Sequence, residues 1–137
     1  MDEGEVAEGI ARSGALAAIG VTVEEVRQGR VRFSFAAAPS LTQQDGFVHA
    51  GVMTTVVDSA CGFAAATLMP PGSRVLTVEF KVNFMAPAAG SRFVCTGTVI
   101  RAGRTLSVCE GRVEDAETGR EVARMQATMM RLASDAD

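Results

Sequence analysis

The stretch that decides the fold runs from residue 51 to residue 69 and reads GVMTTVVDSACGFAAATLM. Its apolar residues recur at the spacing of one face of an amphipathic helix. They are Met53, Val56, Val57, Ala60, Phe63, Ala64 and Leu68. Because the Pro70-Pro71-Gly72 sequence that follows cannot continue a helix, the sequence predicts one long helix over residues 51–69.

The residues after this helix alternate between apolar and polar, which is the pattern of β-strands. The first such run carries Leu76, Val78, Phe80, Val82 and Phe84. Further strands are predicted over residues 91–101, 105–114 and 121–132, with an Ala102-Gly103 turn between the first two and a turn at 115–119 before the last.

The residues before the long helix predict a helix and then strands. Residues 5–18 contain Val6, Ile10, Leu16 and several alanines, and Gly20 follows. They predict an N-terminal helix within residues 1–19 that ends at Gly20. The alternation through residues 31–35 indicates a strand, and Gln28-Gly29 is expected to be a turn between two strand pieces.

This order of elements indicates an α+β domain, in which an antiparallel sheet packs on one central helix. A length of 137 residues suits a single domain that covers the whole chain. The residues from Ala133 to Asp137 are expected to form a frayed tail.

Composition excludes several classes of function. Apolar residues make up 47% of the chain and the formal net charge is −3, so neither disorder nor a nucleic-acid partner is expected. No apolar run is long enough to span a bilayer, and the acidic N-terminus does not look like a signal peptide, so a cytoplasmic location is expected. One histidine and three widely spaced cysteines make a metal site improbable.

Asp58 is the first candidate for a chemical role. A helical projection places it opposite the apolar face, beside the small residues Thr54, Thr55, Gly62 and Ala65. Most surface carboxylates are simply solvated. This face, however, lacks the Lys, Glu and Arg residues of an ordinary solvated surface, so it leaves room for a ligand or for another chain.

The beginning of the helix, Val48-His49-Ala50-Gly51, is the second candidate. The first amides of a helix have no intrahelical acceptor and carry the positive end of the helix dipole. They can stabilise charge that develops on an acyl oxygen, and Gly51 permits a close approach. His49 is either an acid–base group or a residue that caps the helix or fills a pocket. Gln43, in the preceding polar loop, can orient a water molecule or a carboxylate.

The two candidates are too far apart to act on one carbonyl carbon. The rise of a helix separates Ala50 from Asp58 by roughly 12 Å. A site that is shared between two chains removes this difficulty.

From Gln43 onward, the chain resembles the PaaI-type acyl-CoA thioesterases of the hot-dog superfamily. The first match is Gly46-Phe47-Val48-His49-Ala50-Gly51-Val52-Met53 followed by Val57-Asp58-Ser59-Ala60, which is similar to the His-Gly-Gly motif with its later acidic residue. The others are residues 76–88 and the Ile100–Thr105 hairpin. Ala50 departs from the usual Gly, and its amide keeps the same role only if its φ angle is negative.

The resemblance implies a curved antiparallel sheet wrapped around the central helix, and subunits that pair into homodimers and then homotetramers. It implies hydrolysis of acyl-CoA to a free acid and CoA, without a metal or another cofactor. Asp58 would be the general base or the nucleophile, and the Ala50 amide of the other chain would polarise the thioester carbonyl. Gln43 and Thr77 would help to hold the water or the substrate.

Some assignments remain open. Arg101 and Arg104 either contact coenzyme A phosphates or are ordinary hairpin arginines, and Asn83 is a candidate for the site entrance. The alternative functions are a hot-dog hydratase or dehydratase of enoyl and hydroxyacyl thioesters, and a non-catalytic module that binds acyl thioesters.

Overall fold

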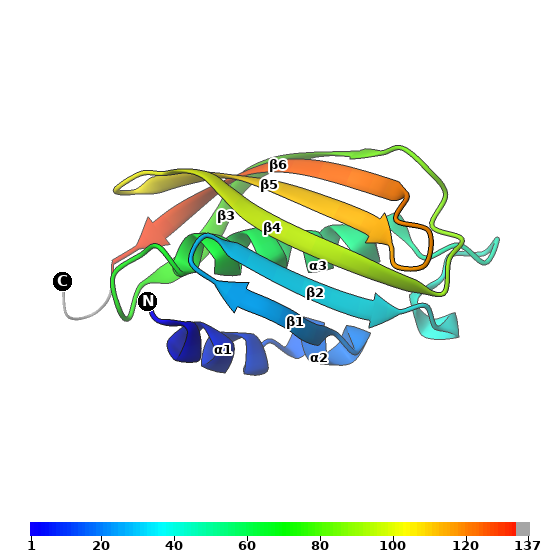
Figure 1. Ribbon diagram of the computed structural model, residues 1–137, viewed down its shortest axis with the longest axis horizontal. Helices are drawn as coiled ribbons and strands as arrows, with labels where there is room; N and C mark the ends of the chain where they lie inside the picture. The colour runs from blue at the N-terminus through cyan, green and yellow to red at the C-terminus, as the bar shows by residue number, and fades with distance from the viewer. Residues whose placement is uncertain (134–137) are drawn as a thin grey trace.

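The computed structural model describes residues 1–133, and its sheet curves over one central helix (Figure 1). The element order is α1 (Glu3–Ala11), α2 (Gly14–Ile19), β1 (Thr22–Arg27), β2 (Arg30–Ala36), η1 (Pro39–Leu41), α3 (Ala50–Ala66), β3 (Arg74–Phe84), β4 (Arg92–Ala102), β5 (Leu106–Asp115) and β6 (Glu121–Leu132). The six strands follow the order β1-β2-β4-β5-β6-β3, and every neighbouring pair is antiparallel. The predicted α+β class is confirmed. Residues 134–137 of the expected frayed tail lie outside the described residues.

The long helix α3 packs its predicted apolar face into the sheet, where Met53, Val57, Ala60 and Ala64 are all buried. Several details differ from the prediction. The helix begins at Ala50, and Leu68, which was assigned to the apolar face, is 42% exposed. The helix ends at Ala66 rather than at Met69. Ala65 was expected beside Asp58 on the face away from the core, but it is fully buried, because the curved sheet and the N-terminal segment enclose more than one face of the helix.

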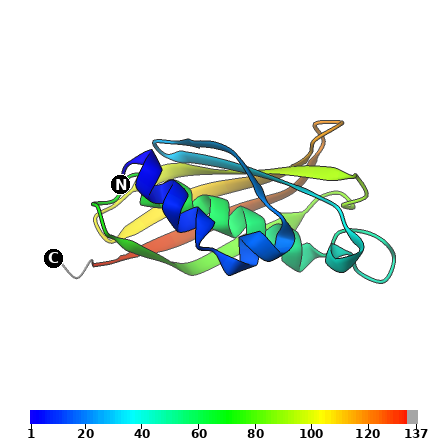
Figure 2. The same cartoon turned by 90° about the horizontal axis from the view of Figure 1, so that it is seen from below.

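The N-terminal segment forms two helices, so the prediction of one continuous helix was wrong. The hydroxyl of Ser13 accepts a hydrogen bond from the Leu16 amide and caps α2, which starts a new helix after α1 has ended. Gly20 ends α2 with a φ angle of 81°, as predicted. Figure 2 shows α1 and α2 in front of α3, next to β1.

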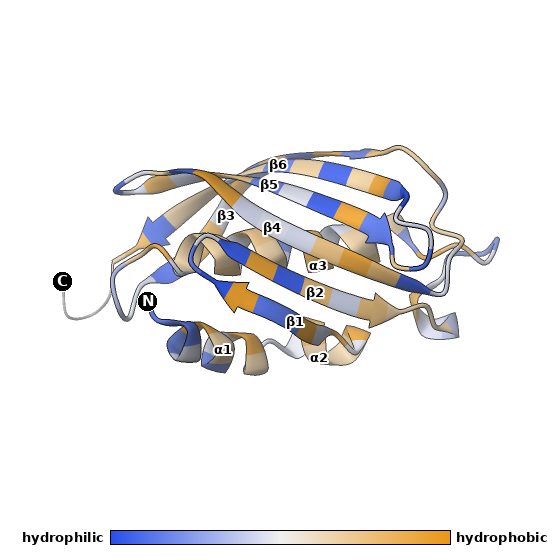
Figure 3. Cartoon of the chain, in the orientation of Figure 1, coloured by the Kyte–Doolittle hydropathy of each residue, from blue (hydrophilic) through white to orange (hydrophobic). Residues whose placement is uncertain are grey.

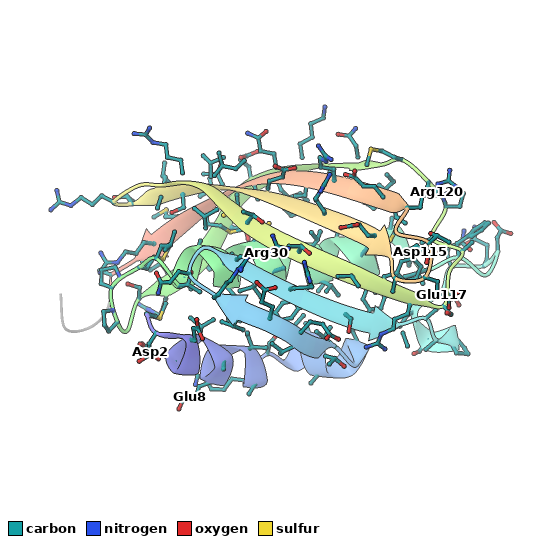
Figure 4. The ribbon with its side chains drawn as sticks, viewed as in Figure 1. Asp2, Glu8, Arg30, Asp115, Glu117 and Arg120 are labelled. Carbon is teal, nitrogen blue, oxygen red and sulfur yellow. The ribbon has the colours of Figure 1, made fainter. Side chains whose placement is uncertain are left out.

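The strands confirm the predicted alternation, and the last one, β6, has the predicted bounds. In β2, Val31, Phe33 and Phe35 are fully buried in the core. Figure 3 shows the alternating hydropathy along this strand. Figure 4 shows Arg30, the first residue of β2, on the outer face of the sheet. Within residues 1–133, none of the helices combines the length and apolar character needed to cross a membrane.

The strand β3 lies at one edge of the sheet and differs from β2 in its register and in the exposure of its apolar side chains. Its register with β6 shifts between Thr77 and Glu79, which leaves Val78 as a bulged residue. Several of its large apolar side chains are exposed, with 54% of Val78, 42% of Phe80 and 43% of Phe84 accessible. The predicted apolar pattern is therefore present, but within one chain only Val82 of this set packs against the core.

Candidate active site

Asp58 and Thr77 form the centre of the candidate site. The Thr77 hydroxyl, on β3, donates a hydrogen bond to Asp58 Oδ1, on α3, over 2.7 Å. Thr77 is the last residue of β3 before the bulge, and its Oγ1 also lies 3.4 Å from the Met129 sulfur. The structure thus joins two predicted site residues that are 19 positions apart in the chain.

Burial and hydrogen bonding have opposite effects on the pKa of Asp58. Desolvation raises the pKa of Asp58 above its ordinary value of 3.8, and the hydrogen bond from Thr77 partly opposes that rise. A raised pKa makes the ionised carboxylate a stronger base, which suits a group that removes a proton from water. Asp58 is only partly buried, so it remains accessible to a reacting molecule.

The nearby thiol of Cys61 does not compete for this role. Its side chain is fully buried, and burial raises its pKa. A thiol in that state stays protonated and is a poor nucleophile.

The beginning of α3 presents one free amide. His49 is the N-cap residue, and its Nδ1 atom accepts a hydrogen bond from the Gly51 amide over 2.9 Å. That contact fits the capping interpretation of His49. The Ala50 amide, at the first helical position, makes no hydrogen bond within residues 1–133. It is therefore available to a carbonyl oxygen.

Ala50 and Gly51 both fit the backbone geometry at the beginning of α3. No non-glycine residue among residues 1–133 has a positive φ angle, so Ala50 meets the condition on which its amide can replace that of Gly. A Cβ atom at Gly51 would lie only 3.2 Å from His49 Nδ1. The glycine thus makes room for the histidine cap, which is a second reason for Gly at this position.

Gln43 organises the loop before α3. Its Oε1 accepts hydrogen bonds from the amides of Asp45 and Phe47, and its backbone amide donates to the Phe47 carbonyl. Because Oε1 is occupied, only the Nε2 group can contact a substrate, and it can only donate. The amide of Gln43 therefore suits a carbonyl or water oxygen as its partner.

Within one chain, the candidate site residues form two separate groups. Thr77 lies beside Asp58, whereas Gln43 and His49 lie at the N-terminal end of α3. The helix is continuous from Ala50 through Asp58, so the rise of roughly 12 Å between them holds.

The Asp58 group opens into a cavity of about 490 Å³, a volume typical of small-molecule sites. Helix α3 and strand β3 supply most of one wall, and α1 supplies Val6 and Gly9. Sequence reasoning missed this contribution from α1. In the sequence, the helical spacing of Val6, Gly9 and Ile10 indicates a face of α1 that packs inward.

Three predicted substrate-binding residues lie elsewhere. Asn83 pairs with Arg124 in the sheet register and lines a different hollow, together with Lys81. Arg101 lies near the end of β4 and Arg104 in the turn after it, and both are exposed. None of the three lines the cavity that contains Asp58.

Comparisons with known proteins agree with this architecture. The crystal structure of a thioesterase family protein from Silicibacter pomeroyi is 43% identical, covers 95% of this chain and 97% of its own, and superposes with a TM-score of 0.92. The PaaI protein of Escherichia coli shares the fold with a TM-score of 0.86, at 13% identity and 96% coverage of both chains.

One protein with a similar sequence is named for its substrate class. The medium/long-chain acyl-CoA thioesterase YigI of Salmonella typhimurium is 25% identical over 112 residues, which cover 71% of each chain. The family model described as Thioesterase superfamily matches residues 45–122, more than half of the 137-residue chain. The chain therefore belongs to the thioesterase superfamily and has its hot-dog fold.

Proposed function

We propose that this protein hydrolyses acyl-CoA thioesters to a free acid and CoA, with Asp58 as the catalytic carboxylate. The observation that carries the proposal is the Asp58–Thr77 pair at a cavity of about 490 Å³, where burial raises the pKa of the carboxyl group. Membership in the thioesterase superfamily and the name of the relative YigI support acyl-CoA as the substrate class.

In the proposed reaction, the thioester carbonyl accepts a hydrogen bond from the Ala50 amide at the positive end of α3. Asp58 removes a proton from a water molecule as that water attacks the carbonyl carbon. The tetrahedral intermediate then collapses to the acid product and expels CoA as a thiolate, which takes up the proton that Asp58 removed from water. The reaction needs no redox step and no metal ion.

The two groups would act on one carbonyl across a dimer interface. Strand β3 is an edge strand with exposed apolar side chains, and such an edge is a template for pairing with another chain. Pairing of two β3 strands would place Asp58 of one protomer near the Ala50 amide of its partner. A homotetramer of such dimers is the further expectation.

The test is a turnover assay over a panel of acyl-CoA substrates with wild type and Asp58→Asn. We expect Asp58→Asn to lose about 10²–10⁴-fold in kcat, the usual contribution of a general base. The matched control is Glu8→Gln, since Glu8 points away from the body of the protein in Figure 4. Full activity of Asp58→Asn would disprove the assigned role.

A single turnover in heavy-oxygen water distinguishes the two possible roles of Asp58. If Asp58 is the base, the label enters the acid product directly. If Asp58 is the nucleophile, the water attacks the acyl–Asp58 anhydride, and mass spectrometry finds part of the label in the Asp58 carboxylate.

The competing functions give different results in the same assays. A hydratase would add water to an enoyl thioester and leave the thioester bond intact. A non-catalytic module would bind acyl-CoA without turnover across the whole panel.

A further inference from the structure

The cavity beside Asp58 extends along α3 towards the C-terminal end of the helix. Asp58, Gly62 and Ala66 all line it, and their spacing of four residues places them in one row on the helix. That row is roughly 12 Å long at the helical rise. The cavity is therefore an elongated trench with the catalytic carboxylate near one end.

Helix α1 forms the opposite wall and runs in the reverse direction to α3. Its first turn lies near the end of α3, where the Glu5 carboxylate accepts a hydrogen bond from the Gly72 amide over 2.8 Å. Val6 and Gly9 then follow along the trench. The contact between Glu5 and Gly72 fixes α1 at the end of the trench that is remote from Asp58.

Two glycines, one on each wall, keep the trench open. A Cβ atom at Gly9 would lie 3.3 Å from Phe63 Cε1, and one at Gly62 would lie 3.9 Å from the Met129 sulfur. Any side chain larger than a methyl group at Gly9 would therefore extend towards Phe63 or into the space between the two helices. Gly9 is therefore a position on α1 at which a larger side chain would narrow the trench.

The middle of the trench is apolar and its ends are polar. Val6, Phe63, Ala66, Val75 and Met129 contribute apolar side chains to its walls. The Glu5 carboxylate at the far end is already hydrogen-bonded to the chain, and Arg12 and Arg74 are exposed at the rim. An unbranched aliphatic chain fits such walls, because it removes apolar surface from water and leaves no polar group unpaired.

We propose that this trench holds the acyl chain of the substrate and that Gly9 of α1 determines how long a chain is accepted. The inference rests on the proposed thioesterase function, since Asp58 and Thr77 lie at the end where the thioester would be. The substrate class is a medium-length, unbranched acyl thioester whose chain lies between α1 and α3.

The test measures kcat/KM for a series from butyryl-CoA to dodecanoyl-CoA with Gly9→Leu and the matched control Gly14→Leu. Leucine favours a helix more than glycine does, so neither change weakens its own helix. Gly14 has open space around it and does not line the trench. We expect Gly9→Leu to lower the decanoyl-to-butyryl ratio about tenfold or more, and Gly14→Leu to leave it unchanged. Equal ratios in both variants would overturn the inference.

Phe63→Leu should widen the trench, whereas Gly9→Leu should narrow it. The Phe63 ring forms an edge contact with Phe33, with 6.3 Å between ring centroids, and also faces the trench. Replacement of the ring by a smaller side chain widens the trench, so we expect the preference to shift towards longer chains. A shift in the same direction as Gly9→Leu would show that the two residues do not act as walls.

Decanol binding, measured by calorimetry, separates this inference from the proposed function. If wild type hydrolyses no acyl-CoA, the proposed function fails, but the trench is still tested by this measurement. Binding of decanol to wild type and Gly14→Leu, with about tenfold weaker binding to Gly9→Leu, would support the trench. Equal binding to all three proteins, or no binding to wild type, would overturn it.

Discussion

At the scale of single residues, Asp58 is subject to two opposing effects. Burial disfavours the ionised carboxylate and raises its pKa, while the Thr77 hydroxyl stabilises the ionised form by a hydrogen bond. Burial is the larger effect. Thr77 therefore acts as a positioning residue, which orients the carboxylate and limits how far its pKa rises.

Removal of the Thr77 hydroxyl tests this balance. In Thr77→Val, the pKa of Asp58 should rise further, because the hydrogen bond that lowers it is gone. The proposed mechanism requires ionised Asp58, so the acid limb of the kcat/KM profile should move to higher pH. Thr77→Ser keeps a hydroxyl and should restore the wild-type profile. Coincident acid limbs in Thr77→Val and wild type would show that the hydrogen bond does not tune Asp58.

His49 is the second residue whose role can be separated by substitution. Its Nδ1 atom caps α3, so His49→Ala should lower stability by about 1 kcal/mol. Asn is also a good N-cap residue, and His49→Asn should keep most of the stability and of the activity. Thermal unfolding and kcat/KM, measured together, distinguish a cap from an acid–base group. Loss of activity in His49→Asn with normal stability would indicate direct participation of the imidazole.

At the scale of elements, the position of Asp58 depends on how closely α3 packs on the sheet. Gly97 of β4 lies directly against the helix, and a Cβ atom there would be 2.4 Å from the Ala60 carbonyl carbon and the Cys61 amide nitrogen. A Cβ atom at Gly111 of β5 would lie 2.5 Å from Val57 Cγ2. These glycines allow contact between the helix backbone and the sheet.

Gly97→Ala should therefore be strongly destabilising. The new methyl group meets backbone atoms that cannot rotate away, so we expect a loss of about 3 kcal/mol, the upper part of the range for overpacked cores. Gly14→Ala is the control, because nothing lies within 4 Å of the added atom. Chemical denaturation of both variants measures the difference. Equal stability would mean that α3 can shift away from β4 at little cost.

At the scale of the whole molecule, the two edges of the sheet differ. The edge strand β1 is short, has a bulge between Val23 and Glu25 and lies next to α1 and α2 (Figure 1). These features protect an edge from pairing. The 11-residue strand β3 has exposed apolar side chains instead. This asymmetry favours β3 as the edge at which two chains pair.

A charge on β3 should separate the chains. We expect wild type to be a dimer or larger, and Phe80→Asp to be a monomer with activity reduced about tenfold or more, because burial of an unpaired carboxylate at an interface is costly. Val23→Asp is the matched control, since Val23 is 44% exposed on the opposite edge and Phe80 is 42% exposed. Light scattering and kcat/KM provide the measurements. A fully active Phe80→Asp monomer would contradict a shared site.

The sequence by itself determined what depends on neighbours along the chain. The apolar period of residues 53–64, the Gln28-Gly29 turn, the end of α2 at Gly20 and the bounds of β6 all follow from local sequence preferences. The candidate residues Asp58, Ala50, Gln43 and Thr77 came from helix geometry and a family resemblance. The break between α1 and α2 is local too, because Ser13 caps the start of α2.

Only the tertiary structure decided which distant residues meet. The hydrogen bond between Thr77 and Asp58 depends on how the edge strand β3 packs beside α3, and the trench depends on α1 packing antiparallel to α3. The burial of Ala65 depends on the elements that enclose α3. The apolar period of a sequence predicts on which face of its helix or strand a residue lies. It does not predict which element covers that face, because strand order, sheet curvature and helix docking arise from contacts across the whole chain.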